Sequence, residues 1–210
     1  MIGSFPRKDD YYNRAIENAE QRTVFILWRG NQHLGAFMFE AVPPFDFVSS
    51  KSPEIAINDE AIILPESLIY EYFRDDAPFD EFIARLKLAK GSRPILVGTP
   101  PPKKDEQFLR SIMSTEAYWK KDASIRMVNI MDAKITHPAT RLKLWIVVQG
   151  LLEQAARRHD IEFCPVPIEV QTCEGYLREQ YYGMDATHAW GGYGQIMRDH
   201  LHAKYMSQQG

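Results

Sequence analysis

An aspartate and a histidine lie three residues apart near the end of this chain, in the segment Asp185-Ala-Thr-His188. An imidazole takes a proton from a hydroxyl most effectively when a carboxylate fixes its tautomer and stabilises the imidazolium that forms. The spacing therefore favours an acid–base pair. Aspartate is also a residue that caps helices, and Thr187 could share that role. The sequence leaves both interpretations open.

Other side chains that could do chemistry give less specific signals. Tyr176, Tyr181, Tyr182 and Trp190 are close to the pair along the chain, and such rings either wall a cleft for a sugar or acyl group or pack in a core. His33 either contacts a substrate or, as we expect, lies at the surface or caps a helix. The histidines, cysteines and carboxylates lack the paired spacing of a metal site, so we expect no metal.

The composition indicates one globular domain over residues 1–210, with 45% hydrophobic and 25% charged residues. A net charge of -3 and an isoelectric point near 6.1 give no electrostatic reason to bind nucleic acid or an acidic membrane. The two cysteines, Cys164 and Cys173, exclude a disulfide framework and a zinc site of four thiolates. One bridge between them stays open, but we expect two free thiols, with Cys164 buried as a small apolar residue.

The first ten residues become polar too early to supply the apolar core of a secretory signal. No stretch of the sequence approaches the ~20 apolar residues that span a bilayer. The expected location is therefore the cytoplasm, although an incomplete N-terminus would hide a signal.

Short apolar runs alternate with amphipathic segments along the chain. Strands are expected from Thr23 to Trp28, from Pro94 to Gly98 and from Ile161 to Pro165. Helices are expected over residues 9–21, 32–41, 65–73, 79–90, 106–113, 139–159 and 189–204. Two further segments, 43–64 and 118–138, have no readable pattern and are expected to be loops.

This alternation predicts an α/β fold with a mostly parallel sheet and helices on both faces. In such sheets the reactive groups gather at the carboxyl ends of the strands. Asn31 follows the first strand, Pro100 to Pro102 follow the second, and Asp185 with His188 comes after the third. We therefore expect all of them on one rim of the sheet.

Three blocks of the sequence share their order with a known enzyme family. The segment from Glu179-Gln-Tyr-Tyr-Gly183 through Asp185-Ala-Thr-His188 to Gly194 resembles the terminal block of the SGNH (GDSL-like) hydrolases, in which Asp-x-x-His supplies two members of a Ser-His-Asp triad. Trp28-Arg-Gly-Asn31 resembles the family's Gly-x-Asn block. Val97-Gly-Thr-Pro-Pro-Pro102 resembles a strand and proline loop that many members carry between these blocks.

The resemblance implies a three-layer α/β/α fold with a flavodoxin-like sheet. It makes His188 the general base, Asp185 its orienting carboxylate and Asn31 an oxyanion donor, and one fixed amide donor of that kind lowers an acyl-transfer barrier by about 3 kcal/mol. Gly30 would let the backbone approach the substrate. The implied substrate is an ester, such as an O-acyl group of a carbohydrate or small molecule, and no cofactor is needed.

The chain departs from the family at two points. Arg29 stands where the Gly-x-Asn block begins with glycine. The family's nucleophilic serine also follows a strand well ahead of the Asn, whereas Ser4 is the only candidate here and no strand precedes it. The sheet is therefore expected to lack one or two N-terminal strands. Such a loss exposes the edge of the strand from Thr23 to Trp28, and an apolar edge favours a homodimer.

The missing nucleophile leaves several functions open. With His188 as base, water or an acceptor hydroxyl could replace Ser4, which would give slower hydrolysis or acyl transfer. A partner chain could instead complete the site. The alternative from another class is a catalytically degenerate member of the family, a pseudoenzyme that acts as a binding or assembly module.

Overall fold

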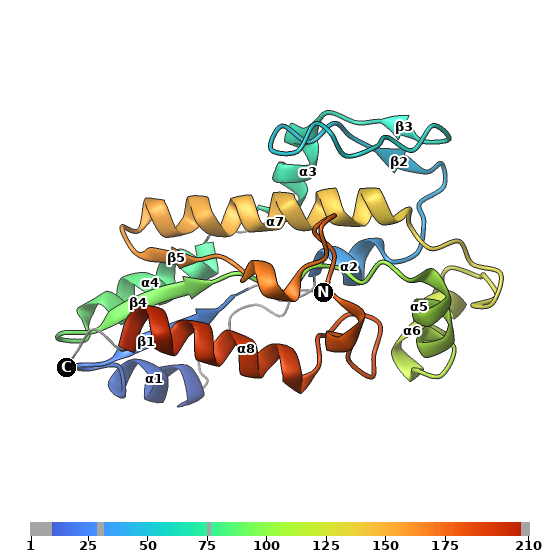
Figure 1. The fold of residues 1–210 in the computed structure, drawn as a ribbon. Helices are drawn as coiled ribbons and strands as arrows, with labels where there is room; N and C mark the ends of the chain where they lie inside the picture. The colour runs from blue at the N-terminus through green and yellow to red at the C-terminus, as the bar shows by residue number, and fades with distance from the viewer. Residues whose placement is uncertain (1–9, 29–31, 75–76, 207–210) are drawn as a thin grey trace.

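The computed structural model describes residues 10–28, 32–74 and 77–206, and a small parallel sheet lies at its centre (Figure 1). Its strands are β1 (Thr23–Leu27), β4 (Arg93–Val97) and β5 (Glu162–Cys164), in the order β1-β4-β5. Leu27 pairs with Val97 and Val97 with Cys164, so all three strands end at the same edge. The three predicted strands and their parallel arrangement are confirmed.

All seven predicted helices are also present, most of them with ends shifted by a few residues. They are α1 (Asp10–Glu17), α2 (Gln32–Phe37), α3 (Glu66–Phe73), α4 (Ala77–Leu88), α5 (Glu106–Met113), α7 (Pro138–Arg158) and α8 (Gly191–Leu201), which continues as the π-helical turn η3 (His202–Met206). Pro138 occupies the first turn of α7, where its missing N–H costs nothing and its fixed φ suits the helix. No helix in the described ranges is long and apolar enough to span a bilayer.

The side chains of β4 pack in two different core clusters, because neighbouring residues of a strand point to opposite faces. Leu96 packs in one cluster with residues of α4 and α7. Ile95 and Val97 pack in another that contains residues of α8 and Tyr205. Figure 1 shows α7 and α8 running along the strands, with the strands between them. The chain is thus a mixed helix and strand fold around a parallel sheet.

Strand β1 is an outer strand of the described sheet, with β4 as its neighbour. The Leu27 side chain, at its carboxyl end, is 80% exposed. The absence of one or two strands beyond β1 stays a prediction.

The prediction of a loop over residues 118–138 is wrong, because it contains most of the helix α6 (Ala117–Ile125). Only Trp119 and Ala123, four residues apart, are buried in α6, and so short an apolar stripe is hard to detect. The helix ends in a Schellman motif: the Val128 N–H donates to the Ala123 carbonyl at 3.0 Å, and the Met127 N–H donates to that of Ser124 at 3.1 Å. Met127 has a φ of 56° and is 92% exposed.

Smaller corrections apply to two helix ends and to one loop. The last helix begins at Gly191 rather than Ala189, because Ala189 forms an antiparallel bridge with Tyr182. The helix expected over residues 32–41 ends at Phe37, since Phe39 pairs with Ile135. The predicted loop 43–64 contains two short parallel strands, β2 (Phe45–Asp46) and β3 (Ile62–Ile63).

A buried ion pair anchors this β2–β3 segment to α7. Lys143 Nζ donates to Asp46 Oδ2 at 2.7 Å, and both side chains are fully buried. The Asp46 carboxylate also accepts the backbone N–H groups of Phe47 at 2.9 Å and Asn58 at 2.8 Å. Because each charge is paired and hydrogen-bonded, its burial is tolerated.

Candidate functional site

The loop after β4 leads to the candidate site. Beyond Val97 the chain passes through the three prolines to Lys103, whose Nζ donates to the carbonyl oxygens of Asp185 and, at 3.3 Å, Gly183. Residues 183–188, which we call the Asp–His turn, therefore lie beyond the carboxyl end of β4. For this part of the site, the predicted placement on the rim of the sheet agrees with the structure.

Asp185 and His188 interact directly within the Asp–His turn. The ring nitrogen Nδ1 of His188 lies 2.9 Å from Asp185 Oδ2. Asp185 Oδ1 accepts the backbone N–H groups of His188 at 2.6 Å and of Thr187 at 2.8 Å. Burial opposes ionisation of Asp185, but these hydrogen bonds and the nearby imidazole outweigh it and lower the pKa of the carboxyl. Asp185 is therefore an ionised partner for the imidazole.

The structure contradicts the interpretation of Asp185 as a helix cap. The next helix, α8, begins at Gly191 and has Trp190 at its N-cap position. The backbone N–H groups that Asp185 accepts belong to a turn, which closes through a hydrogen bond from the Gly183 N–H to the His188 carbonyl at 3.2 Å. The turn is tight, since a Cβ on Gly183 would lie 2.6 Å from that carbonyl oxygen.

The hydrogen bond to Asp185 assigns the protons on the imidazole. An ionised carboxylate only accepts, so Nδ1 of His188 carries a proton and Nε2 is the basic nitrogen. The His188 side chain is 69% exposed, which places it within reach of water and of molecules that bind at the surface. The hydroxyl of Thr187 is 3.4 Å from Nδ1 and so lies on the side of the ring away from the basic nitrogen.

Lys103 is a member of the site that the sequence reasoning missed. The residue is almost completely buried, and its Nζ lies 5.1 Å from the centre of the Phe108 ring and 5.4 Å from that of Tyr182. Burial lowers the pKa of Lys103 to about 8, although the carboxylates of Asp185 and Glu116 act in the opposite direction. The available signal was a lysine directly after three prolines at a strand end.

Glu116 is a second member of the site that the sequence reasoning missed. Its Oε1 accepts the backbone N–H of Ala186 at 2.9 Å. Burial raises the pKa of Glu116, and the charge of Asp185 raises it further, while the hydrogen bond from Ala186 and the charges of Lys103 and His188 act in the opposite direction. Lys103 and Glu116 thus hold the backbone of the turn through opposite charges.

Arg141, near the start of α7, binds the backbone of Lys103. Its guanidinium is buried and donates to the carbonyl oxygens of Lys103 at 2.6 Å, Thr136 at 2.9 Å and Lys104 at 3.2 Å. Burial lowers the pKa of Arg141 to about 10, so the group stays charged at neutral pH. The loop between β4 and α5 is therefore fixed to α7.

Ser4, Gly30 and Asn31 lie outside the described residues. The nucleophile and the oxyanion donor that the sequence suggests therefore stay predictions. Strand β1 ends at Leu27, which pairs with Val97 at the end of β4, and α2 begins at Gln32.

The expectation that His33 lies at the surface or caps a helix is wrong. In the first turn of α2 its side chain is 1% exposed, and neither ring nitrogen has a hydrogen-bond partner in the described part of the chain. Burial lowers the pKa of His33 to about 3. It is a neutral imidazole directly after residues 29–31.

The aromatic residues near the pair have different roles. Tyr176 is buried in the core. Tyr182 packs beside Phe108, with 5.0 Å between ring centres, and its hydroxyl accepts the Lys104 N–H at 3.0 Å. Trp190 is 59% exposed. Packing therefore accounts for the two tyrosines, while Trp190 presents its ring at the surface.

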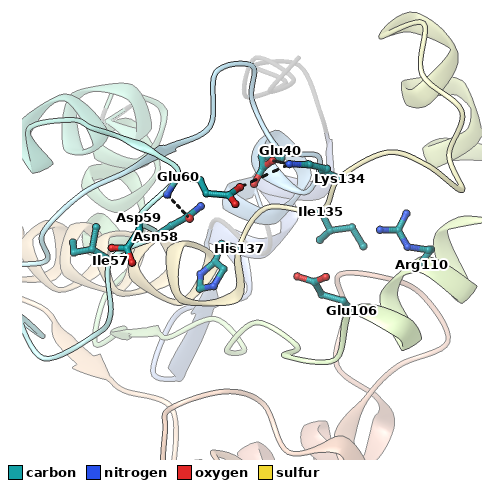
Figure 2. A pocket seen from close by; sticks show the side chains of 10 residues that line it. All are labelled: Glu40, Ile57, Asn58, Asp59, Glu60, Glu106, Arg110, Lys134, Ile135 and His137. Atoms are coloured by element: carbon teal, nitrogen blue, oxygen red, sulfur yellow. Dashed lines mark hydrogen bonds and ion pairs between the residues drawn. The ribbon is translucent and has the colours of Figure 1, made fainter.

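A pocket of about 530 Å³ opens on the face of α5 that is opposite to Phe108 (Figure 2). Glu106 and Arg110 line it from α5, whereas Phe108 of the same helix contacts Tyr182 near the Asp–His turn. The lining is mostly polar and charged, and it suits a ligand rich in hydrogen-bonding groups. The remaining lining residues are Glu40, Ile57, Asn58, Asp59, Glu60, Lys134, Ile135 and His137.

Both cysteines are free and Cys164 is buried, as the sequence predicted, while Cys173 is exposed. Within the described ranges, no group of three histidine, cysteine or acidic side chains could hold a metal ion. The chain matches no model of a known protein family and no curated protein. Its function is therefore argued from the site.

Proposed function

We propose that this chain is an SGNH-type acyl hydrolase that acts on an O-acyl ester of a carbohydrate or small molecule. The observation that carries the proposal is the hydrogen bond between His188 Nδ1 and Asp185 Oδ2. It leaves Nε2 as the basic nitrogen, which is the arrangement of a general base in acyl transfer. The sequence resemblance supplies the family, and the geometry of the pair supports it.

In the proposed reaction, Nε2 of His188 takes the proton of the attacking hydroxyl while its oxygen bonds to the acyl carbon. Asp185 stabilises the imidazolium, and Asn31 donates to the oxyanion. When the tetrahedral intermediate collapses, the ester C–O bond breaks and the imidazolium returns its proton to the leaving alkoxide. The attacking hydroxyl belongs to Ser4, to water or to an acceptor alcohol, and in the last case the chain is an acyltransferase. With Ser4 the acyl group first stays on the serine oxygen. A water molecule that gives its proton to Nε2 then attacks the acyl carbon, the bond to the serine oxygen breaks, and the serine regains its proton as the acid leaves.

The surroundings of the pair are consistent with a polar substrate. His188 and Trp190 are both exposed, and an aromatic ring beside a catalytic base provides a surface for the apolar face of a sugar. The proposal also includes the finer features of the fold: a three-layer, flavodoxin-like sheet, a homodimer formed through the edge of β1, and a cytoplasmic location.

The test is hydrolysis of p-nitrophenyl acetate and of an acetylated monosaccharide by the wild type and three variants. We expect His188→Gln and Asp185→Asn to lose at least ~100-fold in kcat/KM. The first substitution removes the imidazole that takes the proton, and the second removes the charge that orients and stabilises it. His202→Gln, which changes an exposed histidine in η3, is the matched control and should keep full activity. Equal activity in all four proteins would refute the role of the pair.

The Ser4→Ala variant identifies the nucleophile. Loss of activity and of fluorophosphonate labelling in Ser4→Ala would assign that role to Ser4, whereas unchanged activity would assign it to water or an acceptor.

The mass in solution, measured on the same samples, reports whether a second copy is present. A monomer would contradict pairing through β1.

A second candidate is a binding module that keeps the fold without turnover. The specific observation in its favour is the high exposure of His188, since a catalytic base is usually shielded from bulk water. Complete inactivity of the wild type on both esters, together with no labelling by fluorophosphonate, would favour this candidate over the hydrolase.

A further inference from the structure

We infer that Lys103 is a positioning residue, whose buried ammonium group holds the Asp–His turn in the conformation that pairs Asp185 with His188. An effect of Lys103 on catalysis rests on the proposed function, but its role in holding the turn, which we call its mechanical role, does not. Lys103 is separated from Asp185 by 82 positions in the sequence, so the contact exists only in the folded chain.

The first argument is the burial of the ammonium group. Lysine is rarely buried, because taking a charged amine out of water is costly unless other groups replace the water. Here the replacement comes from the Asp–His turn itself, as the Lys103 Nζ donates to the carbonyl oxygens of Gly183 and Asp185. The adjacent rings of Phe108 and Tyr182 lie against the group, with their centres 5.1 and 5.4 Å from Nζ.

The second argument is the position of the two carbonyl groups. Gly183 begins the turn, and its N–H closes the turn by donating to the His188 carbonyl. Asp185 carries the carboxylate that binds the imidazole. Lys103 therefore links the start of the turn to the residue that orients the base. If it were removed, a buried carbonyl group and a half-buried one would lose their donor, and the turn would gain freedom to move.

The third argument is that Lys103 is itself held in place. Arg141 binds its carbonyl oxygen at 2.6 Å and that of Lys104 at 3.2 Å. A chain of contacts thus runs from α7 through Lys103 to the Asp–His turn. Because Lys103 lies between α7 and the turn in this chain, a change at Lys103 should loosen the turn but leave α7 unchanged.

Protonation of Lys103 gives this link a pH dependence. The groups that face the ammonium are the carboxylates of Asp185 and Glu116 and the phenol ring of Tyr182, while Arg141 lies behind its backbone. With the pKa of Lys103 lowered to about 8 by burial, the amine loses its charge at a pH where an exposed lysine keeps it. Above this pH the neutral amine holds the carbonyl groups less strongly.

The experiment measures amide hydrogen exchange of the turn in the wild type, Lys103→Met and Lys104→Met. Methionine keeps the length and apolar stem of lysine but lacks the amine. Lys104 is the matched control, because it is adjacent and its exposed amine pairs with Glu174 on the surface. We expect exchange at Thr187 and His188 to rise at least tenfold in Lys103→Met, with α7 unchanged, and to stay as in the wild type in Lys104→Met.

The wild type alone provides a second measurement if Lys103→Met fails to fold. After correction for the intrinsic effect of hydroxide, protection of the Thr187 and His188 amides should fall between pH 7 and pH 9.5, while that of α7 stays constant. Unchanged protection of the turn in both experiments would overturn the inference, whether or not the protein hydrolyses esters.

Ester hydrolysis then separates this inference from the proposed function. If the wild type is active, Lys103→Met should lower kcat with little change in KM, because the base is displaced while the substrate surface is intact. A change in KM alone would contradict positioning of the base. If the wild type is inactive but exchange of the turn responds as expected, the proposed function fails and the mechanical role of Lys103 stands.

Discussion

Replacing His33 with leucine should make the protein less sensitive to acid. In the folded protein, burial lowers the pKa of His33 to about 3, whereas the unfolded chain has the ordinary value of 6.5. The unfolded state therefore binds a proton that the folded state does not. At pH values above 6.5 this difference has no effect, and the stability is lost progressively as the pH falls from 6.5 toward 3.

The size of the effect follows from this pH interval. Each pH unit below 6.5 costs about 1.4 kcal/mol of unfolding free energy, so between pH 7.5 and pH 5.0 His33 alone should cost about 2 kcal/mol. His33→Leu removes the titrating group and also the two ring nitrogens that lack partners in the described structure. The variant should thus lose about 2 kcal/mol less than the wild type over this interval.

Urea unfolding, followed by tryptophan fluorescence at the two pH values, measures this difference. Other titrating groups contribute equally to both proteins and cancel in the comparison. His202→Gln, at an exposed position, is the control and should keep the pH dependence of the wild type. If the wild type and His33→Leu lose the same free energy between pH 7.5 and pH 5.0, His33 is not a neutral buried imidazole and the reasoning is refuted.

Two stability predictions concern α6 and the β2–β3 segment, both measured by urea unfolding at neutral pH. Met127→Gly should stabilise the fold by about 0.5 to 1 kcal/mol, because glycine adopts the left-handed φ of 56° without steric cost, and a loss of stability would contradict this. Lys143→Met should destabilise by about 3 to 5 kcal/mol, since it leaves the Asp46 carboxylate buried without its partner. Adding Asp46→Asn should recover part of that loss, and a double variant as unstable as Lys143→Met would show that the unpaired charge is not the cause.

Local patterns in the sequence were sufficient to predict most of the sheet and the longer helices. The run from Pro94 to Gly98 is apolar because β4 is buried, and the helix expected over residues 106–113 has the bounds of α5. The helix α6 was missed because only Trp119 and Ala123 face the core. An amphipathic pattern this short does not differ from chance.

In the candidate site, the contact between residues close in sequence could be predicted, whereas the contacts between distant residues could not. Asp185 and His188 are three residues apart, so their pairing could be read from spacing and is confirmed at 2.9 Å. The contacts of Lys103 and Glu116 with the turn bridge 82 and 70 positions. No single-sequence pattern encodes such a contact, because it depends on how the elements pack. For the same reason His33 was placed at the surface, since its burial is decided by tertiary structure.

The first turns of α7 carry two buried cations, Arg141 and Lys143, two positions apart. Successive helical residues are rotated by about 100°, so these side chains leave the helix on nearly opposite sides. One fixes the loop that carries Lys103, and the other fixes the β2–β3 segment. Detachment of either segment would break the hydrogen bonds of a buried cation on α7. The start of α7 is therefore a common anchor for two segments that are far apart in the sequence.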